Sequence, residues 1–385
     1  MTDPRTAPQP SARPQRRVLV FMDSGTPSGP VKQLAATIRP LADAGYALHC
    51  VVFQRRGTPA VTSEPYLRAH GATTSLVHDS GAFDLRLLGA VARVIREFRP
   101  DLVQTHGYRP SVLMALLRKS GTIRDPWIGF FHGRTAESFR VRMYDKLDHI
   151  ALRASDVAAV MSALQKREKA GYRRAEVRIV YNAVIESARK APPAHEVALV
   201  KGPWARPAIG VIGRLSPEKG VDVLLEAWAV LVRDGTAGTL LIAGDGQERG
   251  RLEEQARTLA IADRVHFLGH LEAPDLLYPE LDLMVIPSRT EGLPNVFLEA
   301  LRHGIPVVST RVGAIPDLVG DTAIARLVHI EDPAALAAAI AATLANPEDR
   351  APDAAAELVR SLSLPARVAA LTRLYEDVLS RAGRS

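Results

Sequence analysis

The 385-residue sequence contains a single cysteine and no long hydrophobic run. Because Cys50 is the lone thiol, an internal disulfide and a cysteine-based metal site are both excluded. No stretch reaches the roughly 20 apolar residues that cross a bilayer, and Asp23 follows Arg16 and Arg17 too soon for a secretory signal peptide. We therefore expect a cytoplasmic protein that is either soluble or peripheral at the inner face of the membrane.

Aromatic residues are also scarce, at 5%, and they are not interleaved with basic residues as in nucleic-acid-binding modules. Nucleic acid is therefore not an expected partner. The charge is unevenly divided: residues 1–195 contain 30 Lys and Arg against 16 Asp and Glu, and residues 196–385 contain 19 against 26. The halves thus carry +14 and −7. A basic first half favours anionic lipid or phosphate-bearing ligands, and the alternative is an ordinary arginine-rich surface.

The order of the apolar segments predicts two α/β domains, since 385 residues exceed what one core usually organises. Short β-branched runs such as RVLVFM alternate with amphipathic stretches, which is typical of parallel sheets covered by helices. The pattern pauses at 186–207 and restarts with AIGVIG, TLLIAG and LDLMVIP. We divide the chain into a flexible tail at 1–16, an N-terminal domain at 17–190, a linker at 191–206, a C-terminal domain at 207–364 and a C-terminal helix at 365–385 that packs back on the N-terminal domain.

One basic turn follows a predicted strand of the second domain. The segment GRLSPEKG runs from Gly213 to Gly220 and precedes the helical pattern VDVLLEAWAVLV. Arg214 and Lys219 lie five residues apart in this turn, so both cationic groups can converge on one anion. A diphosphate is the expected ligand, and the alternative is a turn whose charges face water.

Two acids surround the start of a later predicted helix. Glu291 and Glu299 lie eight positions apart, and Pro294 fits the first helical position of a segment that ends near Gly304. The backbone N–H groups at such a helix start form a site for phosphate. A sugar nucleotide fits this layout, with the diphosphate at the helix start and one acid for the ribose and one for the sugar. The alternative is that both acids have only structural roles.

These segments together resemble the donor domain of retaining glycosyltransferases of family 4, the group 1 glycosyltransferases with the GT-B fold. The resemblance is strongest across 205–325, through GRLSPEKG, AGDGQERGRLEEQA and PSRTEGLPNVFLEALRHG, and looser across 17–185, through THGYRP and FFHGRTAES. The family's E-x7-E signature corresponds to Glu291 and Glu299. The resemblance implies an α/β chain of the GT-B fold, in which two doubly wound Rossmann-like domains face a central cleft.

The resemblance also implies roles for individual residues. The expected donor-binding residues are Arg214, Lys219, Asn295, Val296, Glu299 and Gly29. Among them, the two cations and the N–H groups of Asn295 and Val296 would bind the diphosphate, while Glu299 would hold the ribose. Glu291 and His132 are the expected catalytic residues near the transferred sugar. His106, which also follows a strand of the first domain, is the candidate on the acceptor side.

No metal site and no cofactor are expected. The sequence contains no D-x-D motif, so the diphosphate would be neutralised by cations and a helix start instead of a metal ion. The co-substrate would be a nucleotide-diphosphate sugar, either a UDP-sugar or a GDP-sugar. The first loop departs from the family, which often has paired glycines where this chain has Ser28, Gly29 and Pro30. Proline removes one N–H donor from that loop.

The implied function is a retaining, metal-independent glycosyltransferase of hexosyltransferase type. It would move a sugar onto a glycan, glycolipid or lipid-linked acceptor in polysaccharide or glycoconjugate biosynthesis. The alternatives are a non-catalytic nucleotide-sugar-binding scaffold and a GT-B sugar-nucleotide epimerase. Glycoside hydrolysis also uses two carboxylates, but a two-domain cleft that excludes water suits transfer better. Residues 134–178 contain eleven Lys and Arg, so this part of the first domain is expected to approach an anionic membrane.

Overall fold

The structure is a computed structural model that describes most of the chain. The described residues are 15–55, 57, 59–79, 86–133, 139–172, 175–185, 193–346 and 351–383, without the side chains of 139–142 and 145. Most of the predicted tail at 1–16 and part of the predicted linker at 191–206 therefore lie outside the described residues. Strand β1 begins at Arg16, the last residue assigned to the tail.

The N-terminal half forms a parallel seven-stranded sheet in the order β3-β2-β1-β4-β5-β6-β7. Its strands are β1 (Arg16–Met22), β2 (Tyr46–Arg55), β3 (Thr73–Asp79), β4 (Leu102–His106), β5 (Trp127–Phe131), β6 (Val157–Val160) and β7 (Glu176–Ile179). Its helices are α1 (Gly29–Asp43), α2 (Ser63–Ala69), α3 (Arg86–Phe98), α4 (Tyr108–Lys119), α5 (Phe139–Leu152) and α6 (Ala163–Glu168).

The C-terminal half forms a parallel six-stranded sheet in the order β10-β9-β8-β11-β12-β13. Its strands are β8 (Ala208–Ile212), β9 (Thr239–Ala243), β10 (Val265–Gly269), β11 (Leu283–Ile286), β12 (Val307–Thr310) and β13 (Ala325–Val328). The helices from the linker onwards are α7 (Ala194–Val200), α8 (Val221–Arg233), α9 (Arg249–Thr258), α10 (Asn295–Arg302), α11 (Ile315–Val319), α12 (Pro333–Ala345), α13 (Pro352–Ser361) and α14 (Leu364–Arg381).

Both sheets have the doubly wound strand order, which confirms the predicted fold class. In each sheet the direction of winding reverses beside the first strand, between β1 and β4 and between β8 and β11. Ligands of such sheets bind outside the carboxyl ends of the strands at this reversal. Strands β1, β5 and β6 are mostly apolar, as is typical of parallel strands covered on both faces, and Val18, Val20 and Phe21 of β1 are fully buried.

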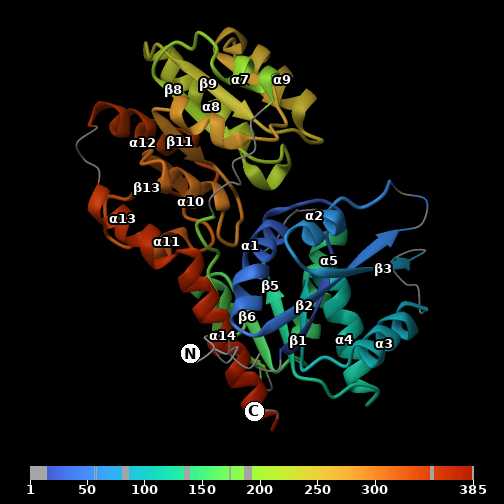
Figure 1. The fold of residues 1–385 in the computed structure, drawn as a ribbon. Helices are drawn as coiled ribbons and strands as arrows, with labels where there is room; N and C mark the ends of the chain where they lie inside the picture. The colour runs from blue at the N-terminus through green and yellow to red at the C-terminus, as the bar shows by residue number, and fades with distance from the viewer. Residues whose placement is uncertain are drawn as a thin grey trace, which may run out of the picture.

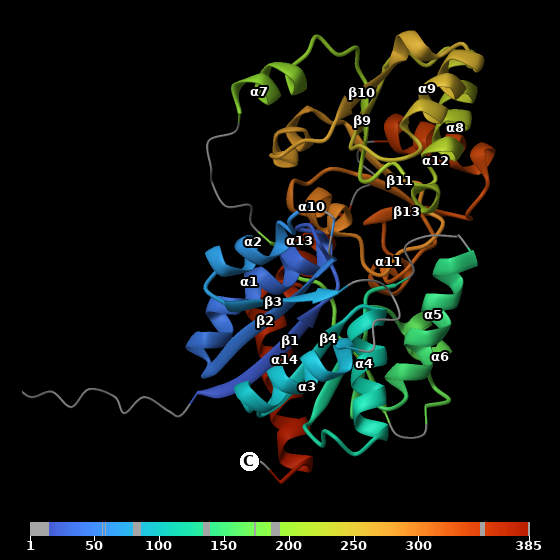
Figure 2. The ribbon, with the colours of Figure 1, turned by 90° about the vertical axis from the view of Figure 1, so that its right-hand side faces the viewer.

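The C-terminal helix packs on the N-terminal domain, although the C-terminal domain precedes it in sequence. Helix α14 packs against α1 and runs beside the N-terminal sheet towards the C-terminus (Figure 1). Tyr375 of this helix is fully buried and meets the ring of Tyr46 edge to face, with 5.1 Å between ring centroids. Figure 2 shows the two lobes stacked one above the other, with α14 behind the lower lobe. The N-terminal domain is therefore completed by the last helix of the chain.

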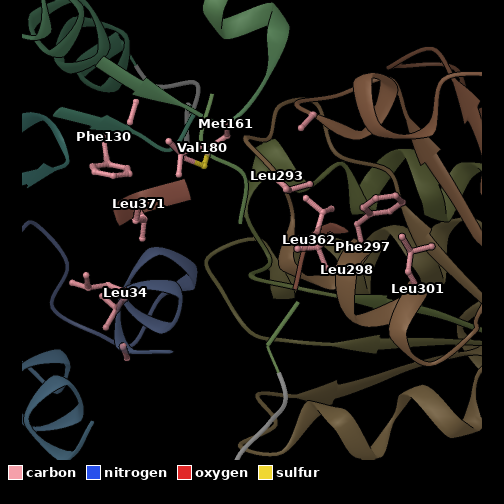
Figure 3. Packing of buried hydrophobic residues seen from close by; sticks show 14 of the residues in the cluster. Leu34, Phe130, Met161, Val180, Leu293, Phe297, Leu298, Leu301, Leu362 and Leu371 are labelled. Carbon is pink, nitrogen blue, oxygen red and sulfur yellow. The ribbon is translucent and has the colours of Figure 1, made fainter. Parts of the chain in front are cut away.

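The largest hydrophobic cluster continues from one domain into the other. It joins N-terminal residues such as Met161 and Val180 to C-terminal residues such as Leu293 and Phe297, all within one set of buried contacts. Met161 and Leu293 lie close together where the two halves meet in Figure 3. In the described part of the chain, no helix has both the length and the apolar character needed to span a membrane.

Candidate functional site

The candidate residues lie at the carboxyl ends of strands from both sheets. The basic turn follows β8, the first acid follows β11, and the two histidines stand at or just after the ends of β4 and β5. Because all strands within each sheet are parallel, these ends share one edge of their sheet. The two edges meet between the lobes, since residues from both contact one another there.

The basic turn and the first acid form one pocket. Its lining includes Arg214, Lys219, Ser288, Glu291 and Val296. The ammonium of Lys219 lies 2.7 Å from Glu291 Oε1, and the Ser288 hydroxyl donates to the same oxygen at 2.8 Å. The structure therefore places Lys219 against the acid, while Arg214 is exposed beside them.

The second acid has a different partner. Glu299 Oε2 accepts a hydrogen bond of 2.5 Å from the hydroxyl of Tyr278, whose ring stacks on His303. Burial raises the pKa of Glu299, and the Tyr278 hydrogen bond opposes that rise. No sequence motif pointed to Tyr278, which lies 21 residues before the acid. Since Glu291 and Glu299 have separate partners, the structure gives them separate environments.

Helix α10 begins one residue later than predicted. Pro294 has φ −64° and ψ 128°, so it is the residue before the helix and Asn295 is the first helical residue. The prediction of Pro294 inside the helix was wrong by one position, because the proline's extended ψ does not fit a helical turn. The helix ends at Arg302, with His303 as its C-cap. The first N–H groups of the helix still lack acceptors within it, as at every helix start.

The side chain of Asn295 ties this helix start to the N-terminal domain. Asn295 Oδ1 accepts from Gln33 Nε2 at 3.1 Å and from Asn182 Nδ2 at 3.2 Å. Gln33 also bonds both backbone groups of Ala183. Gly29, at the start of α1, lies so close that a Cβ there would be 3.3 Å from Asn295 Nδ2. Sequence reasoning assigned no role to Gln33 or Asn182, because their partner Asn295 lies 262 and 113 residues away from them in the chain.

The two candidate histidines contact each other directly. His106 Nδ1 lies 2.8 Å from His132 Nε2, and the His106 ring stacks on Phe130 with 4.6 Å between centroids. Burial lowers the pKa of His132 to about 3, with a further contribution from Arg367. Burial, His132 and Arg367 together hold the pKa of His106 well below its ordinary value. Both rings are therefore neutral near pH 7.

A hydrogen-bond chain from α14 assigns the tautomers of this pair. Gln104 Nε2 donates to the Tyr375 hydroxyl, and Gln104 Oε1 lies 3.4 Å from His106 Nε2. With the Gln104 amide in this orientation its oxygen accepts, so His106 carries its proton on Nε2 and accepts through Nδ1. His132 must then donate from Nε2, which leaves its Nδ1 as a hydrogen-bond acceptor. The C-terminal helix thus determines what His132 can bind.

Two further charged groups escaped the sequence reasoning. Arg367 of α14 is 7% exposed and donates to the carbonyl of Tyr181, and burial lowers its pKa to about 10. Asp23 follows β1, lies 3.6 Å from Arg109, and has a pKa raised by burial. Neither has a sequence signature: the buried arginine is recognised only when α14 is placed on the N-terminal sheet.

A metal-binding cluster is not found in the part of the chain that the structure describes. No group of three or more His, Cys, Asp or Glu side chains there is arranged to hold an ion. Cys50 is buried, and burial raises the pKa of its thiol to about 12, so it is a poor ligand or nucleophile.

Two family profiles match the chain, one on each domain. The profile described as Glycosyltransferase Family 4 matches residues 27–187, and the profile described as Glycosyl transferases group 1 matches residues 206–346. A 2-deoxystreptamine N-acetyl-D-glucosaminyltransferase from Streptomyces fradiae is 31% identical over 299 residues, covering 72% of this chain and 70% of that protein. A 2-deoxystreptamine glucosyltransferase from Streptomyces kanamyceticus is 28% identical, covering 68% and 72%.

Solved structures share the fold over nearly the whole chain. Sucrose-phosphate synthase from Thermosynechococcus elongatus has a TM-score of 0.77 at 20% identity and covers 95% of this chain and 100% of its own. HepE from Anabaena, in complex with UDP and glucose, has a TM-score of 0.75 at 20% identity, with 94% and 100% covered. These likenesses confirm the GT-B arrangement of two doubly wound domains.

Proposed function

The chain belongs to the group 1 glycosyltransferases of family 4, which use nucleotide-sugar donors, and from this premise we propose that it is a retaining, metal-independent hexosyltransferase with a UDP-sugar donor. The observation that carries the proposal is the pocket in which Lys219 and Ser288 bind Glu291 beside the start of α10. The pocket brings two cations, a carboxylate and a helix start together. These are the groups that a nucleotide diphosphate and its sugar require.

Each group has a proposed role in holding the donor. Lys219 and Arg214 neutralise the diphosphate, which the N–H groups of Asn295 and Val296 also bind. When the diphosphate arrives, Lys219 exchanges part of its interaction with Glu291 for a phosphate oxygen, and the released carboxylate oxygen faces the sugar. Glu299 accepts the ribose hydroxyls through the oxygen that Tyr278 does not occupy. Gly29 lets the first loop approach the donor closely.

The transfer step needs no metal in this proposal. The bond between the anomeric carbon and the diphosphate oxygen breaks, and a new bond to the acceptor oxygen forms on the same face of the sugar. The acceptor proton passes to the departing diphosphate oxygen, whose charge Lys219 and Arg214 stabilise. His132 accepts a hydrogen bond from a sugar hydroxyl through Nδ1, and His106 supports it on the acceptor side.

The donor test is a binding screen followed by product analysis. UDP-, GDP- and ADP-sugars are titrated calorimetrically, and UDP-sugars are expected to bind most tightly. The structures of HepE from Anabaena in complex with UDP and with UDP-glucose support this choice. Reactions are then run in EDTA with an acceptor panel, and the anomeric configuration of the product is read by NMR. Transfer that stops in EDTA, or a product of inverted configuration, would contradict the proposal.

Two rival functions give different products in the same experiment. A non-catalytic scaffold binds the donor and yields no product with any acceptor. A sugar-nucleotide epimerase changes the donor when no acceptor is present. Incubating wild-type protein with the donor alone, and then with the panel, therefore separates all three functions.

For the acceptor we propose a glycan, glycolipid or lipid-linked sugar. The panel also includes 2-deoxystreptamine, because two Streptomyces relatives are named for it. An acceptor on lipid would require the N-terminal domain to approach a membrane, as the charge of +14 on residues 1–195 allows. The expected location is then the inner membrane face of the cytoplasm.

The outer face of α5 favours such an approach. Met143, Leu147 and Ile150 are 39%, 36% and 60% exposed and lie at helical spacing on one side of the helix. Lys146 and Arg153 are exposed beside them. Apolar side chains flanked by cations suit an anionic lipid surface, to which each cation contributes roughly 1 kcal/mol. Residues 134–138 and 173–174 of the basic segment lie outside the described residues.

Vesicle flotation tests this membrane contact. Wild-type protein is expected to float with anionic vesicles at low salt and less so at physiological salt. Ile150→Asp should reduce flotation, whereas Leu199→Asp, at a 40% exposed position on α7, should not. Equal recovery on neutral and anionic vesicles would exclude electrostatic docking.

A further inference from the structure

The loop that carries Glu291 touches the N-terminal domain through a glycine. A Cβ placed on Gly292 would lie 2.3 Å from the carbonyl oxygen of His132 and 3.3 Å from Met161 Cγ. The oxygen belongs to the backbone, so it cannot move aside as a flexible side chain could. The residue after the proposed catalytic acid thus meets the proposed catalytic histidine across the domain boundary.

The glycine at this position is required for space. The φ of Gly292 is outside the left-handed range, so other residues can adopt its backbone conformation. Among the atoms nearest to the added Cβ, all belong to His132 and Met161 of the other domain. A methyl group here would therefore obstruct the approach of the domains without straining the loop itself.

The loop cannot retreat from this contact within its own domain. The carbonyl of Gly292 accepts a hydrogen bond of 2.7 Å from the N–H of Ala314. Behind it, a Cβ on Gly313 would lie 2.0 Å from the same carbonyl oxygen. The loop is thus packed between its own domain and the N-terminal domain. Because the loop cannot move back, a clash with the His132 carbonyl can be relieved only by moving the N-terminal domain away.

Other cross-domain contacts surround this point. Asn182 Nδ2 donates to the carbonyl of Leu293 at 3.0 Å, and Asp317 Oδ2 accepts from the N–H of Ala163 at 2.7 Å. Met161 of the N-terminal domain and Leu293 of this loop belong to the same hydrophobic cluster (Figure 3). These contacts all depend on the distance that the glycine allows.

We propose that Gly292 is a positioning residue that sets the closed distance between the two domains, and with it the distance from Glu291 to His132. This proposal rests on the function proposed above. The bare backbone at 292 lets the His132 carbonyl approach to contact, so the histidine and the acid reach the donor sugar together. Gly133, with φ +99°, performs the matching role on the other side, since its Cβ would lie 2.9 Å from the N atom of Gly292.

The test compares Gly292→Ala with Gly250→Ala, a glycine of α9 with an ordinary φ and nothing within 4 Å of an added Cβ. Turnover of Gly292→Ala should fall about 10- to 100-fold, because misplacement by about 1 Å can cost that much. UDP affinity should stay near the wild-type level, since the cations and the acid proposed to bind the diphosphate and the ribose lie in the C-terminal domain. Gly250→Ala should match the wild type in turnover and in UDP affinity.

Domain distance is measured by fluorescence transfer between labels at Leu164→Cys and Ile330→Cys. Both positions are exposed, one in each domain, and the buried Cys50 with its raised pKa resists labelling. With UDP bound, Gly292→Ala should show lower transfer efficiency than the wild type. Unchanged efficiency, wild-type turnover, or loss of UDP affinity together with turnover would each overturn the proposal.

A second pair of variants separates the effect of the cross-domain contact from the effect of backbone strain at a glycine with positive φ. Gly133 and Gly45 have φ of +99° and +91°, but Gly45 has nothing within 4 Å of an added Cβ. Gly133→Ala should open the domains, while Gly45→Ala should cost only stability. If the wild type glycosylates no acceptor in the panel, the proposed function fails. The distance between the labels still decides whether residues 133 and 292 set the distance between the two domains.

Discussion

The two halves of the candidate site are built in different ways. The donor half gathers charged, partly exposed groups on neighbouring loops of one domain, with Lys219 and Glu291 in direct contact. The opposite half holds two neutral, stacked histidines whose support comes from Gln104 and from Tyr375 at the far end of the chain. Charge therefore organises one half and long-range hydrogen bonding the other. Variants of the first should alter donor affinity, and variants of the second should alter turnover.

Removing the cation of the donor half should have the largest effect. Lys219→Ala takes away the ammonium that bonds Glu291 and that we propose to bind the diphosphate. Loss of one charged donor at a developing anion typically costs about 100- to 1,000-fold in turnover, and we expect donor affinity to fall as well. Steady-state kinetics with the UDP-sugar measures both. Lys201→Ala, at an exposed position outside the pocket, is the control. Full activity in Lys219→Ala would remove the proposed diphosphate site.

The second acid should show a smaller effect confined to binding. Glu299→Gln loses a charged acceptor for the ribose, and hydrogen bonds to charged groups contribute about 1.5 to 3 kcal/mol, or roughly 10- to 150-fold in affinity. Because burial raises the pKa of Glu299, wild-type affinity should also rise as pH increases through that pKa. Calorimetric titration with UDP across pH, for wild type and variant, checks both expectations. A pH-independent wild type with an unaffected variant would exclude ribose binding by this acid.

Substitutions of Gln104 and Tyr375, the residues that support the histidine pair, should affect turnover alone. Gln104→Leu removes the acceptor that keeps the His106 proton on Nε2, so His132 is no longer held as an acceptor at Nδ1. We expect about a tenfold fall in turnover, comparable to one lost neutral hydrogen bond, with UDP affinity unchanged. Tyr375→Phe should act in the same direction more weakly, because the amide oxygen remains. Reduced UDP affinity in either variant would break the division between the two halves.

The pH dependence of stability should also change when the histidine pair is altered. Between about 3 and 6.5, the unfolded chain binds a proton at His132 that the folded chain excludes, so the unfolding free energy rises with pH and is lost as pH falls. Each such proton contributes about 1.4 kcal/mol per pH unit. His132→Gln should flatten the slope of urea-unfolding free energy between pH 6.5 and 4.5. His270→Gln, at an exposed position, should leave it unchanged.

The residues proposed for the donor half could be selected from the sequence because they are close in the chain. Arg214 and Lys219 share one turn, and Glu291 and Glu299 flank one helix start, so short spacing was enough to find them. Their resemblance to a family then supplied the fold. The pairing of Lys219 with Glu291 was not expected, because 72 residues separate the two and only the β8 and β11 neighbourhood in the sheet brings them together.

The other half was predicted only in part, for the same physical reason. His106 and His132 were identified as residues after strands, but their contact depends on the β4 and β5 pairing. The supports of the site lie far away in sequence: Gln33 is 262 residues from Asn295. A polar residue on an amphipathic helix gives no local sign that its partner belongs to another domain. The cross-domain glycine contact likewise becomes visible only when both loops are placed.

The position of α14 gives the chain an order of assembly. Gln104 and Tyr375 are 271 residues apart in the chain. At a synthesis rate of about 5 to 20 residues per second, Tyr375 is therefore added roughly 14 to 54 seconds after Gln104. The N-terminal sheet can pair its strands in that interval, but its groove for α14 stays open. The histidine pair therefore gains its hydrogen-bond support from Tyr375 only after the whole C-terminal domain has been synthesised. A chain truncated before α14 would keep the proposed donor residues but would lack this support for the histidines.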